Sequence, residues 1–217
     1  MLKVGLTGGI ASGKSAVGEM LVALGACLVQ ADRIAHDLML PGQPVYNQVV
    51  RHFGGAILNS DLSVNRAKLA DAAFGPGNDL ASAAVLSRND SRVEELNRIV
   101  HPAVIRSQEE WMEEMGRQDP NAIAIVEAAL ILEAGAAKRF DRLIVVTCSN
   151  EQRILRFAAR HKLPLEAARR EVERRMAAQL PEAEKIRAAD YVIDNSGDLD
   201  QTRERVRQVW EELKARA

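Results

Sequence analysis

Residues 8–15 read Gly8-Gly9-Ile10-Ala11-Ser12-Gly13-Lys14-Ser15 and match the G-x-x-x-x-G-K-S pattern of a P-loop, a loop that holds nucleotide phosphates. A short apolar run at 2–7 precedes the loop, and apolar residues at helical spacing follow it at 17–24. A strand that turns through glycines into a helix directs backbone N–H groups and the positive end of the helix dipole towards one point. The stretch therefore predicts a polyphosphate site between a strand and a helix.

Within this loop, the pattern assigns a role to each group. Lys14 is expected to reach the outer phosphates, and the Ser15 hydroxyl to ligate Mg²⁺. The alternative is a chance glycine-rich turn, but the position between a strand and a helix favours nucleotide binding. The predicted ATP-binding residues of the loop are Gly9, Ile10, Ala11, Ser12, Gly13, Lys14, Ser15 and Ala16.

The bulk properties of the chain exclude several classes of protein. Its 217 residues suit one α/β domain with an insertion, and the net charge of −1 gives no general attraction to nucleic acid or anionic lipid. No apolar stretch is long enough to span a bilayer, and the early strand and P-loop leave no room for a signal peptide. Cys27 and Cys148 form no C-x-x-C pair and suit buried thiols. We expect a cytoplasmic protein, a monomer or weak homo-oligomer, with no nucleic-acid or membrane partner.

A second apolar run at 26–29 leads into Asp32. Ligands of open parallel sheets bind beyond the carboxyl ends of the strands, so we expect Asp32 on the same edge as the P-loop. A carboxylate there can accept the proton of an attacking hydroxyl or hold a Mg²⁺-bound water. The alternative is a cap for a helix that begins at Arg33. The P-loop favours the chemical role.

The segment from Pro41 to about Trp111 carries helical periodicity and few strand signals. A loop is expected at 75–79, and the polar stretch around 87–91 is expected to be exposed. A helical insertion of this kind is where a P-loop kinase keeps its acceptor. Arg66 and His101 are candidates to contact acceptor phosphates or hydroxyls, although each, taken alone, is more often an ordinary surface or capping residue.

The clearest buried strand covers 122–126 and is followed by Glu127, which resembles a Walker B carboxylate that orients Mg²⁺. We expect a helix to begin at 128–133, with Leu130 and Leu132 lining the acceptor pocket. Further strands at 142–146 and 191–193 bring the number of predicted strands to five. A terminal helix follows, whose apolar stripe is formed by Val206, Val209, Trp210 and Leu213.

Between residues 151 and 175 the composition shifts towards arginine. Arg156 and Arg160 share one helical face, and Pro164 marks a turn between two helices. Such a hairpin can close over a nucleotide and place guanidinium groups on the transferring phosphoryl. The alternatives are a solvated helix pair and a nucleic-acid patch. The low aromatic content of 4% disfavours the second, because single-strand binders stack bases on aromatic side chains.

These features, in register along nearly the whole chain, resemble the dephospho-coenzyme A kinase family. The matching stretches are 6–15, Ala31-Asp32-Arg33-Ile34-Ala35, Pro41-Gly42, Phe53-Gly54, Asn65-Arg66 with Leu69 and Phe74, His101-Pro102, 178–181, Lys185 and 189–197. The resemblance implies an α/β, three-layer P-loop kinase fold with a five-stranded parallel sheet, a helical acceptor-binding insertion and an arginine-rich lid. It implies a single domain over 1–217. The core would cover about 1–40, 120–150 and 185–217, the acceptor region about 41–119 and the lid about 151–184.

The resemblance also implies the reaction, which is transfer of the ATP γ-phosphoryl to the ribose 3′-hydroxyl of dephospho-CoA, the last step of coenzyme A biosynthesis, with Mg²⁺. The implied catalytic residues are Lys14, Asp32 and a lid arginine, either Arg156 or Arg160. Asn195 and Gly197 would border the adenine of ATP, in addition to the P-loop residues. The implied metal ligands are Ser15 and Glu127, and the acceptor contacts are Asp32, Arg66, His101, Leu130 and Glu133.

The chain departs from the family pattern in three places. Ala129 stands where the family usually has proline, Gln152 and Arg156 are four residues apart instead of three, and the loop from Gly75 to Asn89 is longer than usual. Two other functions stay open on the residues alone. One is a kinase for another hydroxylated acceptor, such as a nucleoside monophosphate or a sugar acid. The other is a non-catalytic nucleotide switch, which Asp32 opposes because a switch needs no base beside an acceptor.

Overall fold

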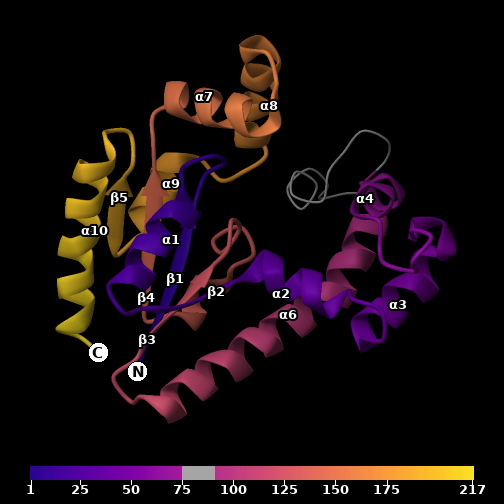
Figure 1. Cartoon of the computed structure of the whole chain (residues 1–217), viewed down its shortest axis with the longest axis horizontal. Helices are drawn as coiled ribbons and strands as arrows, with labels where there is room; N and C mark the ends of the chain where they lie inside the picture. Colours follow the sequence, from indigo (N-terminus) through magenta and orange to yellow (C-terminus); the bar gives the residue numbers. More distant parts are fainter. Residues whose placement is uncertain (75–90) are drawn as a thin grey trace. The chain divides into compact units, whose positions relative to one another are not determined.

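The computed structural model describes residues 1–74 and 91–217, so the loop expected at 75–79 and the longer loop from Gly75 to Asn89 lie outside the described residues. The chain divides into two compact units (Figure 1). The first unit combines Met1–Gln30 with Trp111–Ala217, and the second is Ala31–Glu110. Each unit is described by itself.

The first unit is built on a five-stranded parallel sheet, as the sequence predicts, with the strand order β2-β3-β1-β4-β5. Its strands are β1 (Leu2–Gly8), β2 (Cys27–Gln30), β3 (Ile123–Glu127), β4 (Arg142–Thr147) and β5 (Tyr191–Asp194). β1 lies at the centre, where Leu6 pairs with Glu127 of β3 and Gly8 pairs with Val146 of β4. The carboxyl ends of the strands therefore meet at the edge of the sheet where the P-loop begins.

Helices cover both faces of this sheet and give three layers. Val4, Leu6, Ile125 and Ile144 face α1 (Lys14–Ala23) and α10 (Leu199–Lys214), which lie together on one side (Figure 1). The predicted stripe of the terminal helix is confirmed, because Val206, Val209, Trp210 and Leu213 are all buried in this layer.

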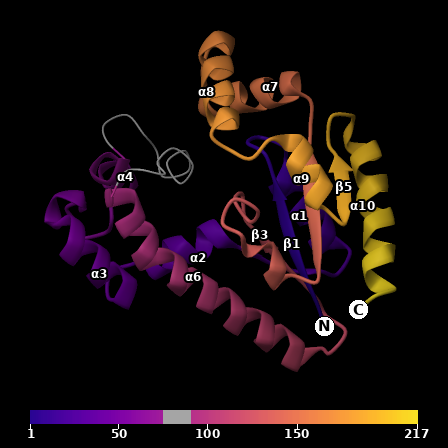
Figure 2. The same ribbon diagram turned by 180° about the vertical axis from the view of Figure 1, so that it is seen from behind.

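The alternate strand residues face the other way, as the period of two in a strand requires. Ala124 and Val126 pack against the end of α6 (Ser91–Gln118), whose residues from Trp111 onwards belong to this unit. Leu143 and Val145 pack under the segment 128–140, and α9 (Glu182–Ala188) lies on the same face (Figure 2). The sheet is thus buried on both sides, which explains why its strands read as continuous apolar runs.

One local prediction is wrong. The expected helix at 128–133 is a series of turns, followed only by the short 3₁₀ helix η2 (Ala136–Arg139). Single-turn hydrogen bonds join Ala134 to Leu130 and Gly135 to Leu132, and the chain then leaves the helical region at Gly135, whose φ is 66°. Ile131 is buried beneath the sheet, so tertiary packing outweighs the local helical pattern.

The arginine-rich segment forms the predicted helix pair, α7 (Asn150–His161) and α8 (Leu165–Ala177). The turn runs through Lys162, with a φ of 54°, and Pro164 precedes the second helix. An apolar core of its own joins the two helices, formed by Ile154, Phe157, Ala158, Ala168 and Val172. Within α8, the pKa of Glu171 is held below its ordinary value, chiefly by hydrogen bonds from Arg174. Burial acts in the opposite direction, and a hydrogen bond from Arg175 lowers the pKa further.

The second unit is helical, as predicted for this part of the chain. It contains α2 (Ala31–Leu38), α3 (Pro44–Phe53), the 3₁₀ helix η1 (Gly55–Ile57), α4 (Arg66–Phe74) and the first part of α6. α3 ends at Gly54, whose φ of 82° suits glycine. The Asn65 side chain accepts backbone N–H bonds from Ala67 and Lys68 and so caps α4. Among the helices that the structure describes, none combines the length and apolarity needed to cross a membrane.

Candidate active site

The P-loop links the end of β1 at Gly8 to the start of α1 at Lys14. Gly13 has a φ of 92°, and a Cβ there would lie 2.1 Å from Nδ2 of Asn195. A Cβ at Gly8 would lie 2.2 Å from the carbonyl oxygen of Val146 on β4. The two glycines of the pattern are therefore required by backbone conformation and by the close approach of neighbouring groups.

The helix that starts at the loop presents a positive end suited to an anion. The first turn of α1 contains no acidic residue that would offset the helix dipole. The Lys14 Nζ donates hydrogen bonds to the carbonyl oxygens of Gly8 (2.9 Å) and Gly9 (3.2 Å), so the ammonium lies against the loop. Ser15 and Ala16 are exposed at the beginning of the helix. This is the arrangement that binds phosphate groups.

The two predicted metal ligands meet beside the loop, although they lie 112 residues apart in sequence. The Ser15 Oγ donates to Glu127 Oε1 at 2.8 Å, and Gln30 Nε2 donates to Glu127 Oε2 at 2.9 Å. The described residues contain no group of three or more histidine, cysteine, aspartate or glutamate side chains that could hold a metal. One hydroxyl and one carboxylate nevertheless fit Mg²⁺, which keeps waters and binds substrate phosphates instead of requiring an all-protein cage.

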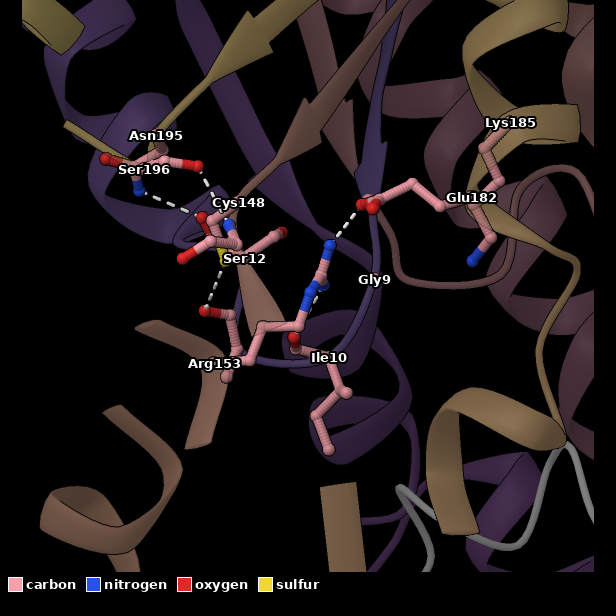
Figure 3. Close-up of polar contacts among 12 residues, drawn as sticks. Gly9, Ile10, Ser12, Cys148, Arg153, Glu182, Lys185, Asn195 and Ser196 are labelled. Carbon is pink, nitrogen blue, oxygen red and sulfur yellow. Dashed lines mark hydrogen bonds and ion pairs between the residues drawn. The ribbon is translucent and has the colours of Figure 1, made fainter. Parts of the chain in front are cut away.

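Side chains from distant elements hold the outer carbonyl groups of the loop (Figure 3). Arg153 Nη1 donates to the Ile10 oxygen at 3.0 Å, and Asn195 Nδ2 donates to the Ser12 oxygen at 2.9 Å. The Cys148 thiol contacts the Ala11 oxygen at 3.7 Å, and burial raises the pKa of this thiol. Sequence reasoning missed Arg153 and Cys148 as site residues, because no local pattern marks them.

The two candidate lid arginines differ in their surroundings. Arg156 donates from Nη2 to the Asn195 carbonyl oxygen at 2.9 Å and from Nη1 to the Ser12 oxygen at 3.4 Å. Arg160 lies one turn further along α7 and is exposed. The structure therefore brings Arg156, and not Arg160, against the P-loop.

The predicted adenine-bordering residues follow β5. The Asn195 side chain is buried, and its Oδ1 accepts from Thr202 Oγ1 at 3.0 Å while its Nδ2 bonds the loop. Gly197 is exposed two residues later. The amide of Asn195 thus ties the P-loop to α10, and its hydrogen-bonding groups face protein on both sides.

Of the predicted acceptor contacts, Glu133 and Leu130 lie in the turn segment of the first unit. Glu133 Oε1 accepts from Lys185 Nζ at 2.7 Å and from the Leu180 N–H at 3.1 Å, and its other carboxylate oxygen has no partner within the described part of the chain. Lys185 is 2% exposed and also donates to Gln179 at 3.2 Å. The charge of Glu133 is therefore balanced by a buried lysine, and Leu130, three residues earlier in the chain, is half-buried.

The remaining candidates, Asp32, Arg66 and His101, belong to the second unit. Asp32 lies within the first turn of α2, Arg66 is the first residue of α4, and His101 lies on α6 beside Pro102, which that helix accommodates. All three side chains are exposed. The Asp32 carboxylate makes no hydrogen bond or ion pair with the residues that the structure describes, which leaves it available.

The dephospho-CoA kinase (CoaE) family model matches residues 2–201 of this chain. The chain belongs to the dephospho-CoA kinase family. Members of this family are kinases that phosphorylate dephospho-CoA with ATP in the final step of coenzyme A biosynthesis. A dephospho-CoA kinase of Moorella thermoacetica is 38% identical over 214 residues, which cover 98% of this chain and 92% of that protein.

Solved structures agree with the fold of this dephospho-CoA kinase family member. TT1252 from Thermus thermophilus has a TM-score of 0.74 and 29% identity, with 97% of this chain and 96% of that chain covered. The dephospho-CoA kinase from Campylobacter jejuni has a TM-score of 0.59 and 23% identity, with the same shares covered. The second likeness bears on the fold alone.

The buried contact between Lys185 and Glu133 leads to a prediction about stability. In Lys185→Met the Glu133 carboxylate loses its partner in a largely buried position, so we expect the free energy of unfolding to fall by about 3 kcal/mol. The double variant Lys185→Met/Glu133→Leu removes both charges and should recover at least half of this loss. Urea denaturation followed by circular dichroism measures both. A single variant as stable as the parent would contradict the assigned ion pair.

Proposed function

We propose that this chain transfers the γ-phosphoryl group of ATP to the ribose 3′-hydroxyl of dephospho-CoA, with Mg²⁺ as cofactor. The observation that carries the proposal is the hydrogen bond between Ser15 and Glu127 beside the P-loop, because it joins a phosphate cradle to a ligand pair suited to magnesium. Family membership supplies the acceptor. A cytoplasmic location and a monomeric or weakly oligomeric state remain predictions from the sequence.

The proposed phosphate chemistry uses groups already gathered at the loop. Backbone N–H groups of the loop would donate to the phosphates, while Lys14 would exchange the carbonyl oxygens of Gly8 and Gly9 for phosphate oxygens. Ser15 and Glu127 would hold Mg²⁺, which neutralises charge on the phosphates when it is bound. Arg156, which already lies at the Ser12 carbonyl, would offset charge on the transferring phosphoryl, and Arg160 is the second candidate.

Asp32 is the proposed base for the acceptor hydroxyl. It follows Gln30, the last residue of β2, by two positions, so chain geometry keeps their Cα atoms within about 7 Å. Gln30 itself bonds Glu127, and its strand ends at the edge of the sheet where phosphates bind. An exposed carboxylate that follows such a strand in the sequence can draw a proton from a hydroxyl during transfer. Arg66, His101, Leu130 and Glu133 remain the predicted acceptor contacts.

A panel of acceptors tests the proposed function. With Mg²⁺-ATP, we expect dephospho-CoA to be phosphorylated at least about 100-fold faster, in kcat/KM, than AMP or gluconate, because a site built for one hydroxyl leaves polar groups unpaired with others. A coupled assay for ADP measures the rates, and chromatography identifies CoA as the product. Equal rates across the three acceptors would reject the assignment.

Asp32→Asn tests the role of the carboxylate while preserving its size. We expect kcat to fall by about 100-fold or more, because general-base catalysis contributes at least this factor, while KM for ATP changes less than about twofold. Asp37→Asn, an exposed residue on the same helix, is the matched control and should retain full activity. Unaltered turnover in Asp32→Asn would reduce Asp32 to a structural residue of the first turn of α2.

A further inference from the structure

Arg153 is a buried cation that joins three elements at the P-loop. It lies near the start of α7 and is 1% exposed. One arm of its guanidinium, Nη1, donates to the Ile10 oxygen at 3.0 Å, and the other, Nη2, forms an ion pair with Glu182 at the start of α9 (Figure 3). The pair also connects the two ends of the segment that contains the α7–α8 hairpin. The fork of an arginine is suited to hold two partners in fixed directions.

The energetics indicate that this arginine is not present for stability alone. Taking a guanidinium out of water is costly, and a buried ion pair is often no more stabilising than apolar side chains of similar volume. Here the Nε–H has no acceptor within the described part of the chain, so the burial is only partly compensated. A Cβ at Gly9 would lie 2.4 Å from Nη1, which shows how closely the guanidinium is packed on the loop.

The position of the Ile10 carbonyl determines where the next N–H group points. The chain contains no cis peptide bond in its described residues, and in a planar trans peptide the C=O and N–H groups point in opposite directions. Arg153 binds the Ile10 oxygen, so the Ala11 N–H points away from the guanidinium. Ala11 itself has a φ of 53°, a strained conformation for alanine that persists only when neighbouring contacts support it.

We propose that Arg153 is a positioning residue for ATP, which fixes the Ile10–Ala11 peptide so that its N–H group faces the phosphates. Glu182 orients the guanidinium for this purpose. The inference rests on the proposed ATP-dependent function, and it adds a residue that touches neither the phosphates nor the acceptor. Loss of Arg153 should therefore weaken nucleotide binding without altering how the acceptor is recognised.

The test compares Arg153→Met, which keeps an unbranched apolar side chain without donors, with the control Arg170→Met at an exposed position of α8. Binding of a fluorescent ATP analogue is measured without acceptor. We expect its Kd, and the KM for ATP, to rise about tenfold in Arg153→Met, the effect of losing one charge-assisted hydrogen bond, while KM for dephospho-CoA changes less than about twofold. Glu182→Gln should raise KM for ATP by a smaller factor, and the double variant should match Arg153→Met, because both residues act through one contact.

Each outcome decides between the possibilities. A folded Arg153→Met protein that binds the analogue as tightly as the parent would overturn the role of Arg153 but not the proposed function. A parent protein that binds no nucleotide would overturn both. If Arg153→Met is unfolded at the assay temperature, Glu182→Gln is compared with Glu184→Gln, an exposed residue of the same helix turn. An unchanged KM for ATP in Glu182→Gln would then overturn the inference.

Discussion

The hydrogen-bonded pairing of β1 between β3 and β4 is the constraint on which the site depends. This central strand delivers the P-loop from its carboxyl end, and its register with β3 places Leu6 opposite Glu127. Parallel strands end at the same edge of the sheet. The P-loop, the Glu127 carboxylate and the end of β4 at Thr147 and Cys148 therefore meet there, although they are far apart in the sequence. A slip of one residue would turn Glu127 to the opposite face of the sheet.

A P-loop must keep several N–H groups unpaired and pointing inward, which is an unfavourable state for a free peptide. In this chain, residues outside the loop stabilise its conformation, because Arg153 and Asn195 donate hydrogen bonds to the carbonyl oxygens of Ile10 and Ser12. Ala11, which has a left-handed backbone conformation, lies between these two hydrogen-bonded residues. The phosphate cradle is therefore preorganised by contacts behind it, and ATP need not provide the ordering energy itself.

The sequence predicts those parts of the molecule whose cause is local or periodic. The P-loop, the five apolar strands and the stripe of α10 follow from spacing along a few residues, and the family resemblance provides the reaction. The helix expected at 128–133 fails because burial of Ile131 and the turn at Gly135 outweigh a short helical pattern. In the sequence, Arg153 cannot be distinguished from the surface arginines around it. Its partners Ile10 and Glu182 lie 143 and 29 residues away and contact it only in the folded chain.

Ser15 and Glu127 are the proposed magnesium ligands of a kinase centred on the P-loop. The most direct test titrates Mg²⁺ at fixed ATP and dephospho-CoA in the parent protein and in Glu127→Gln, which keeps the size of the side chain and removes its charge. We expect the half-saturating Mg²⁺ concentration to rise about tenfold in Glu127→Gln, because loss of a group that orients the metal and its ligands typically costs 10–100-fold in affinity. The same Mg²⁺ dependence in both proteins would contradict it.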